Sequence, residues 1–191
     1  AVLAANKASH ADGSASDWDK ASAVTITLSG NSAKSSGAGV TISGSTVTIT
    51  AAGTYRLTGD LDGQVVVAAA DAEVTLVLDG VDIASTSTAA IAITDADLAV
   101  VVLADGSVNT LSDASSYAED ADVNAALFSS ADLTIAGKGS LTVTGNGNDG
   151  IASKDGLVIE SGTITVTAVD DGIRGKDYLI IDGGDIDVTS G

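Results

Sequence analysis

The apolar and β-branched residues of this chain fall in short runs at alternate positions. Each run is a few residues long and is bounded by Gly, Asp, Asn or Ser. Alternation of this kind between turn residues is the strongest local signal for β-strands, and no stretch shows helical periodicity. The pattern therefore predicts an all-β protein. The clearest strands are expected at Val24–Leu28, Val47–Thr50, Val74–Leu78, Leu141–Thr144 and Thr163–Thr167.

The C-terminal third of the chain repeats itself with a period of 22 residues. Asp149–Leu157 is echoed by Asp171–Leu179, and Gly162–Thr167 by Gly184–Thr189. Similar segments at 132–135 and 139–144 precede them at offsets of 23 or 24. A period in the low twenties carrying three short strands is what a parallel β-helix, a solenoid of stacked coils, requires. The absence of proline agrees, because each coil must donate backbone hydrogen bonds to its neighbour.

The composition excludes several classes of partner and site. The 191-residue chain has 26 acidic and 8 basic residues, a net charge of −18. Nucleic acid and anionic membranes both need a basic face, so the charge excludes them. The chain has no cysteine, which removes disulfides and thiolate sites. Its longest apolar run, Leu98–Ala104, is too short to span a bilayer.

Residues 1–22 differ from the rest and contain the only histidine, His10, and the only tryptophan, Trp18. We expect an N-terminal tail or leader here, which could dock on a partner subunit, followed by one β-helix domain over 23–191. The start Ala1–Ala5 is of the kind left after signal cleavage, so we expect a secreted, extracellular or cell-surface protein.

Acidic turn residues recur one period apart, and stacking would place them nearly on top of each other. Adjacent carboxylates repel unless a cation lies between them, and calcium accepts hard oxygens in loose geometry. An alternative is that Asp and Asn simply suit these turns and that Lys154 and Lys176 neutralise them. The predicted calcium ligands are Asn148, Asp149, Asp155, Asp170, Asp171 and Asp177, with Asp132 continuing the last column.

An insertion at Ser112–Asn124 interrupts the repeat. A loop of this length on a compact domain is more often functional or capping than neutral. Its residues Asp120, Asp122 and Asn124 are secondary metal candidates.

Catalysis is less well supported. The only histidine lies in the tail, which argues against a Ser-His-Asp triad, and stacked carboxylates are too numerous for a glycosidase pair to be specific. Arg174, which is flanked by Asp170, Asp171 and Lys176, could be the proton acceptor of a calcium-dependent polysaccharide lyase. It could equally be a surface arginine that balances acidic neighbours.

Several segments together resemble the secreted bacterial carbohydrate-binding domains that adopt a right-handed β-helix distantly similar to pectate lyases. The resemblance covers roughly Val24–Gly191. The segments that carry it are Val77–Ile83, Asn109–Asp113, Asn124–Ile135, Gly139–Asn146, Asp149–Asp155 and Asp170–Asp177. The resemblance implies more coils than this chain has. The resemblance implies a right-handed helix with calcium at the stacked acidic turns and non-catalytic binding of cellulose or pectin-like polymers.

Two functions thus remain beside the lyase. The first is a calcium-dependent polysaccharide-binding module, with Tyr117, Tyr178, Asn146 and Arg174 as the candidate sugar contacts. Outward Thr-x-Thr pairs such as Thr142/Thr144 could add hydroxyls, although Thr is simply favoured on strands. The second is a filament or homo-oligomer that assembles end to end, because a β-helix without a cap presents unpaired strands.

Overall fold

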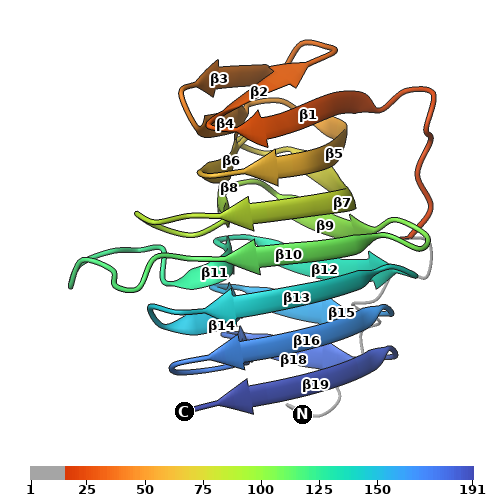
Figure 1. Cartoon of the computed structure of the whole chain (residues 1–191). Coiled ribbons are helices and arrows are strands. Elements are labelled where there is room, and N and C mark those ends of the chain that lie inside the picture. The colour runs from red at the N-terminus through yellow and green to blue at the C-terminus, as the bar shows by residue number, and fades with distance from the viewer. Residues whose placement is uncertain (1–15) are drawn as a thin grey trace.

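A computed structural model of the chain describes residues 16–191, which form an all-β structure without helices (Figure 1). No helix long and apolar enough to cross a membrane therefore occurs in this range. The predicted tail falls largely on residues 1–15, which lie outside the described residues together with His10. The strands are β1 (Val24–Gly30), β2 (Ser32–Ser35), β3 (Val40–Ser43), β4 (Thr46–Ile49), β5 (Gly53–Leu61), β6 (Gln64–Ala68), β7 (Glu73–Ala84), β8 (Ile91–Asp95), β9 (Leu98–Leu103), β10 (Val108–Ser112), β11 (Ala125–Ser129), β12 (Asp132–Gly137), β13 (Ser140–Gly145), β14 (Asp149–Ser153), β15 (Gly156–Ile159), β16 (Thr163–Ala168), β17 (Ile173–Gly175), β18 (Tyr178–Ile181) and β19 (Asp185–Ser190).

From β8 onward each strand pairs in parallel with the strand three places further along the chain. The three series are β8–β11–β14–β17, β9–β12–β15–β18 and β10–β13–β16–β19. Ile151 is in register with Ile173, and Thr163 with Asp185, which is the predicted offset of 22. Leu133 pairs with Leu157 and Leu141 with Ile164, at the predicted offsets of 24 and 23. The sequence repeat is therefore the strand register.

The second and third series join into one curled sheet through the long strand β7, which also pairs with β5. The first half of β7 pairs with β9 and its second half with β10. The strand turns the corner at Gly80, whose φ of 77° suits glycine better than any other residue. The opposite end of the molecule departs from the parallel pattern, because β1–β2 and β3–β4 are antiparallel pairs (Figure 1).

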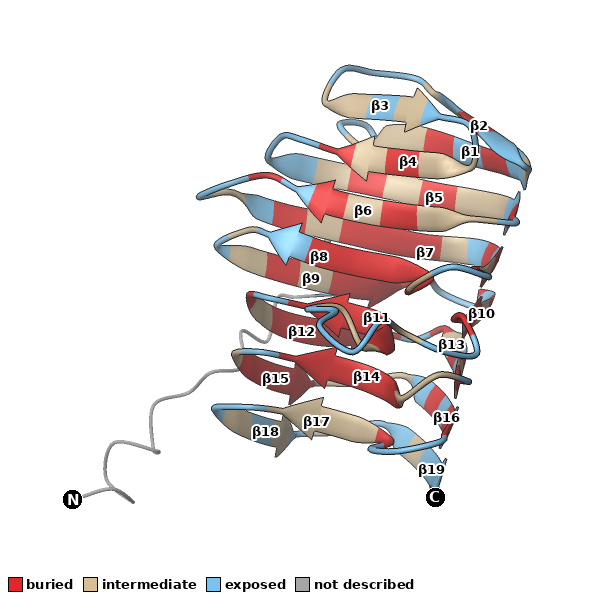
Figure 2. Ribbon diagram, turned by 90° about the vertical axis from the view of Figure 1, so that its left-hand side faces the viewer, coloured by how far each residue is buried: buried red, intermediate tan, exposed pale blue. Residues whose placement is uncertain are grey.

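Inward side chains form aliphatic ladders that account for the high apolar content. One ladder follows the register from Leu76 through Val101, Ile135 and Ile159 to Ile181. Its first four members are fully buried, whereas Ile181 is 55% exposed. Figure 2 shows the same change along the stack, with buried strands in the middle and mostly intermediate or exposed positions on β17, β18 and β19. Burying one such side chain contributes roughly 1.5–3 kcal/mol.

Candidate functional site

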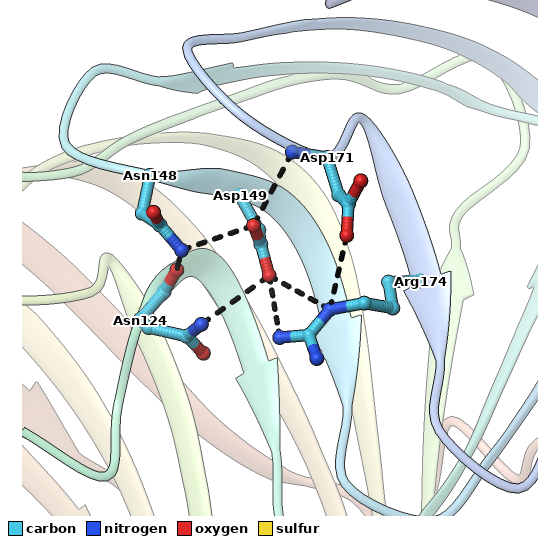
Figure 3. A network of polar contacts seen from close by, with 5 residues as sticks. All are labelled: Asn124, Asn148, Asp149, Asp171 and Arg174. Carbon is cyan, nitrogen blue, oxygen red and sulfur yellow. Dashed lines mark hydrogen bonds and ion pairs between the residues drawn. The ribbon is translucent and has the colours of Figure 1, made fainter.

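Asp149, at the start of β14, is the centre of a network of polar contacts (Figure 3). Its side chain is 1% exposed. Oδ2 accepts hydrogen bonds from Nη2 and Nε of Arg174, at 2.7 and 3.0 Å, and from Nδ2 of Asn124 at 3.3 Å. Oδ1 accepts from Nδ2 of Asn148 at 3.0 Å and from the backbone N of Asp171 at 3.3 Å. Both oxygens are therefore taken by donors that the protein itself supplies.

The stacking of the acidic turns occurs as the repeat implies. The backbone N of Asp170 donates to the O of Asn148 at 3.1 Å, and the N of Asp177 to the O of Asp155 at 3.2 Å. Their side chains nevertheless have different surroundings. Burial raises the pKa of Asp149, while the bonds from Arg174 act in the opposite direction. The guanidinium of Arg174, on the next strand level, therefore lies beside Asp149 where a calcium ion was expected.

The second acidic column has no such internal cation. Burial raises the pKa of Asp155, and the nearby carboxylates of Asp132 and Asp177 raise it further, against the attraction of Lys176. Oδ1 of Asp132 accepts bonds from the backbone N of Gly156 at 2.9 Å and from the hydroxyl of Tyr178 at 3.0 Å. Within residues 16–191, no group of three or more His, Cys, Asp or Glu side chains is arranged to hold a metal ion.

The insertion folds back over the outside of the sheet formed by β8, β11 and β14. Oδ2 of Asp113 accepts the hydroxyl of Tyr117 at 2.6 Å, and Oδ1 accepts the backbone N of Asn146 at 2.5 Å. Burial raises the pKa of Asp113, whereas these bonds lower it. Further along the loop, Val123 packs against the buried ring of Phe128. These contacts fix the predicted loop as a cover over this face.

The secondary metal candidates are not brought together. Oδ1 of Asp122 forms an ion pair with Nζ of Lys154 at 2.7 Å, and that ammonium also lies 5.6 Å from the centre of the Phe128 ring. Asn124 instead donates to Asp149, and Asp120 is exposed in the loop.

The four predicted sugar contacts fall into three places. Tyr117 and Asn146 meet at Asp113, Arg174 lies on Asp149, and Tyr178 lies over Gly156 beside Asp132. The desolvation of its ring and the neighbouring Asp132 raise the pKa of Tyr178 to about 12. No single pocket collects all four.

The outward threonines form continuous rows. Thr142 is in register with Thr165, and Thr144 with Thr167. The row continues to Asp187 and Thr189 on β19. Exposed positions along it include Thr142, Thr165 and Thr167, so β13 and β16 offer a strip of hydroxyls to solvent, which Asp185 and Asp187 interrupt on β19.

One cavity was not anticipated from the sequence. It has a volume of about 410 Å³ and is lined by Ser16, Asp17, Trp18, Lys20, Thr25, Arg56, Asp79, Ala104, Asp105 and Lys138. Trp18 packs on the outward side chains of Val77, Val102 and Ala104. The sequence feature that could have indicated this cavity is Trp18 itself, which is the only tryptophan of the chain and lies just before the first strand.

Comparison with known proteins supports a carbohydrate-related identity. The family model described as "Carbohydrate-binding domain-containing protein" matches residues 43–191. The chain belongs to this carbohydrate-binding domain family. A relative of the same description from Acetivibrio thermocellus (strain ATCC 27405) is 42% identical over 136 residues, which are 68% of this chain and 48% of that protein. This chain therefore spans about half the length of that family member.

A solved structure is also similar. It is titled "Structure of the polysaccharide lyase-like protein from C. thermocellum, Gadolinium derivative". The two share 38% identity with a TM-score of 0.86, over 88% of this chain and 71% of the other. The family match thus confirms the carbohydrate-binding part of the resemblance found in the sequence. The non-enzymatic expectation is consistent with the family description, although the structural neighbour is lyase-like.

Proposed function

We propose that this chain is a non-catalytic, secreted module that binds cell-wall type polysaccharide of the cellulose or pectin class. The observation that carries the proposal is the match to the carbohydrate-binding domain family across residues 43–191. The strip of outward hydroxyls on β13 and β16 supports it, because a polymer can lie along such a surface and exchange hydrogen bonds with it.

The scaffold we propose is a right-handed parallel β-helix. Three parallel series of strands with offsets of 22 to 24 residues are what stacked coils produce. Parallel strands connected by crossovers in one sheet are right-handed in about 98% of cases. The TM-score of 0.86 to a polysaccharide lyase-like protein agrees with this scaffold.

Calcium dependence is retained as a proposal for one of the two columns. At Asp149 an ion does not fit, because Arg174 and the two asparagine amides already occupy both oxygens. At Asp155 and Asp177 the turns stack without an internal guanidinium, so we propose these two as the protein ligands, completed by water or polymer hydroxyls.

A lyase is disfavoured by the surroundings of Arg174. Its guanidinium is held by Asp149 and lies 3.4 Å from Oδ2 of Asp171. To accept a proton from a sugar, this side chain would have to give up both contacts and lose its charge, which would leave Asp149 buried and unpaired.

End-to-end assembly is a second candidate, favoured by the exposed ladder residues at one end. Leu179, Ile181 and Val188 are 41%, 55% and 43% exposed. The other end is closed by the antiparallel β1–β2 and β3–β4 pairs, so a contact through β17–β19 would join two like ends. Light scattering at rising concentration tests it, and a monomer throughout would contradict it.

The binding proposal is tested by pull-down of the full chain on cellulose and on polygalacturonate, with calcium and with EDTA. Retention on at least one polymer is expected, stronger with calcium. Absorbance from unsaturated products, followed in the polygalacturonate sample, is expected to stay flat. No retention on either polymer would overturn binding, and rising absorbance would establish a lyase.

A further inference from the structure

We propose that β3 is a self-pairing edge strand, through which two copies of this chain associate by joining their sheets. The strand ends the seven-stranded sheet at the top of the stack in Figure 1, and it pairs with β4 alone. This contact does not depend on polysaccharide binding. It also lies at the opposite end of the molecule from β17, β18 and β19.

The free edge of β3 carries the backbone groups of Val40 and Ile42. The N of Thr50 donates to the O of Gly39 at 2.8 Å, so these two residues face each other as a hydrogen-bonded pair. Bonded and non-bonded pairs alternate along an antiparallel ladder, which makes Thr41 the next residue bonded to β4. The N–H and C=O groups of Val40 and Ile42 therefore point away from β4, and no partner for them occurs within residues 16–191.

Charge distinguishes β3 from the other edge strands. Natural edge strands are commonly protected from pairing by charged side chains. In this chain β2 contains Lys34, β17 contains Arg174, β19 contains Asp185 and Asp187, and β18 lies between Asp177 and Asp182.

Around β3 such protection is missing. No Asp, Glu, Lys or Arg occurs between Lys34 and Arg56, in a chain with 26 acidic and 8 basic residues. Two copies with a net charge of −18 each repel one another, and the repulsion is least where an uncharged segment meets its own copy. The composition of this edge therefore favours a second copy of the chain as its partner.

The strand is also complementary to itself. With a two-fold axis beside Thr41, Val40 faces Ile42 of the partner subunit, and each such pair exchanges two N–H···O bonds. The half-buried side chains of Val40 and Ile42 already pack against the core, and the pairing continues this apolar layer into the second copy. The exposed side chain of Thr41 then lies directly opposite its own copy.

Sedimentation velocity of the full chain at rising concentration tests this, in EDTA and with enough salt to screen the net charge. A four-residue edge is smaller than a stable interface of roughly 1,000 Å², so we expect a weak dimer that grows with concentration and with salt. Thr41→Lys and Thr41→Asp, each measured alone, should weaken the association about tenfold, because like charges would face each other across the axis. An equal mixture of the two variants should associate more tightly than either alone.

Thr48→Lys is the matched control. Thr48 is in register with Thr41 on the same hairpin but lies on β4, away from the free edge, so this variant should dimerise as the unaltered chain does. Amide exchange adds a second measurement, in which the N–H groups of Val40 and Ile42 become protected as the concentration rises.

A monomer at every concentration would overturn the proposal. So would a dimer that Thr41→Lys leaves intact, which would place the contact at another surface, or a mixture of the two variants no tighter than its components. The pull-down on polysaccharide is expected to give the same retention for Thr41→Lys as for the unaltered chain, so failure of self-pairing leaves the proposed function standing.

Discussion

Nη2 of Arg174 lies 2.7 Å from Oδ2 of Asp149, a carboxylate whose side chain is only 1% exposed. The two residues belong to β17 and β14, which are adjacent in the sheet, so the contact joins two levels of the stack. A buried charge needs both a counter-charge and hydrogen bonds, and this pair supplies both. Divalent metal is therefore unnecessary at Asp149.

Replacing Arg174 with Gln should be markedly destabilising, because it leaves Asp149 buried without a counter-charge. We expect a loss of about 2 kcal/mol in the free energy of unfolding, less than for a fully buried pair because Arg174 is itself 40% exposed. Urea unfolding measures it. Lys176→Gln, two residues away and exposed, is the control for charge alone. Equal stability of the two variants would show that the Asp149 contact contributes nothing.

The protein should become more stable as the pH falls toward the pKa values of Asp113 and Asp155 in the folded state. Burial raises the pKa of Asp113 and Asp155 above the ordinary value of 3.8. The folded state then binds a proton at these two carboxyls more tightly than the unfolded state does. Above the folded pKa the ionised carboxylates therefore lower the free energy of unfolding, and this loss is relieved as the pH falls through that pKa. The ion pair with Lys154 lowers the pKa of Asp122 instead, but this side chain is 91% exposed.

Urea midpoints measured between pH 4 and pH 8 test this, with Asp113→Asn as the comparison. The variant no longer titrates, so its stability should vary less with pH, and its amide oxygen can accept only one of the two bonds that Tyr117 and Asn146 donate to Asp113. Stability that falls steadily as the pH is lowered across this range would contradict the direction of these shifts.

Gly156 leaves space for the ring of Tyr178 on the next strand level. A Cβ at this position would lie 1.9 Å from Cζ of Tyr178. Gly156→Ala should therefore displace the ring and break its bond to Asp132, at a cost of about 1–2 kcal/mol. In a Tyr178→Ala background the same substitution should cost much less, and a double-mutant cycle measures the difference. Additive effects would mean that the ring does not occupy this place.

Calcium should raise the thermal midpoint if it binds at Asp155 and Asp177, since a ligand bound only by the folded state stabilises it. At a calcium concentration 100 times its Kd the gain is about 2.7 kcal/mol. Asp155→Asn should abolish the increase, whereas Asp185→Asn, an exposed acid on β19, should leave it unchanged. An increase that survives Asp155→Asn would place the ion elsewhere.

The parallel register of the strands could be predicted because the sequence repeat spans whole strands. Pairs such as Ile151 with Ile173 face the same ladder, so similar residues recur at the spacing of the register. Side-chain contacts have no such regularity. Whether Asp149 binds a metal or Arg174 depends on the conformation of the long arginine side chain. The packing of Trp18 on Val77 joins segments that the repeat does not relate.

The antiparallel pairs at the N-terminal end escaped prediction for a related reason. Apolar and polar residues alternate in Val40–Ser43 and in Thr46–Ile49 as they do in any strand. Two such neighbouring runs can form either an antiparallel hairpin or two strands on different faces of a stack. Gly44, with a φ of 58°, makes the tight turn between them.

Affinity electrophoresis of the full chain through gels that contain polygalacturonate or soluble cellulose derivative, with calcium in the buffer, tests the central claim most directly. We predict that migration is retarded in proportion to polymer concentration, relative to a non-binding acidic protein of similar size. Unchanged migration in both polymers at every concentration would contradict polysaccharide binding as the function of this chain.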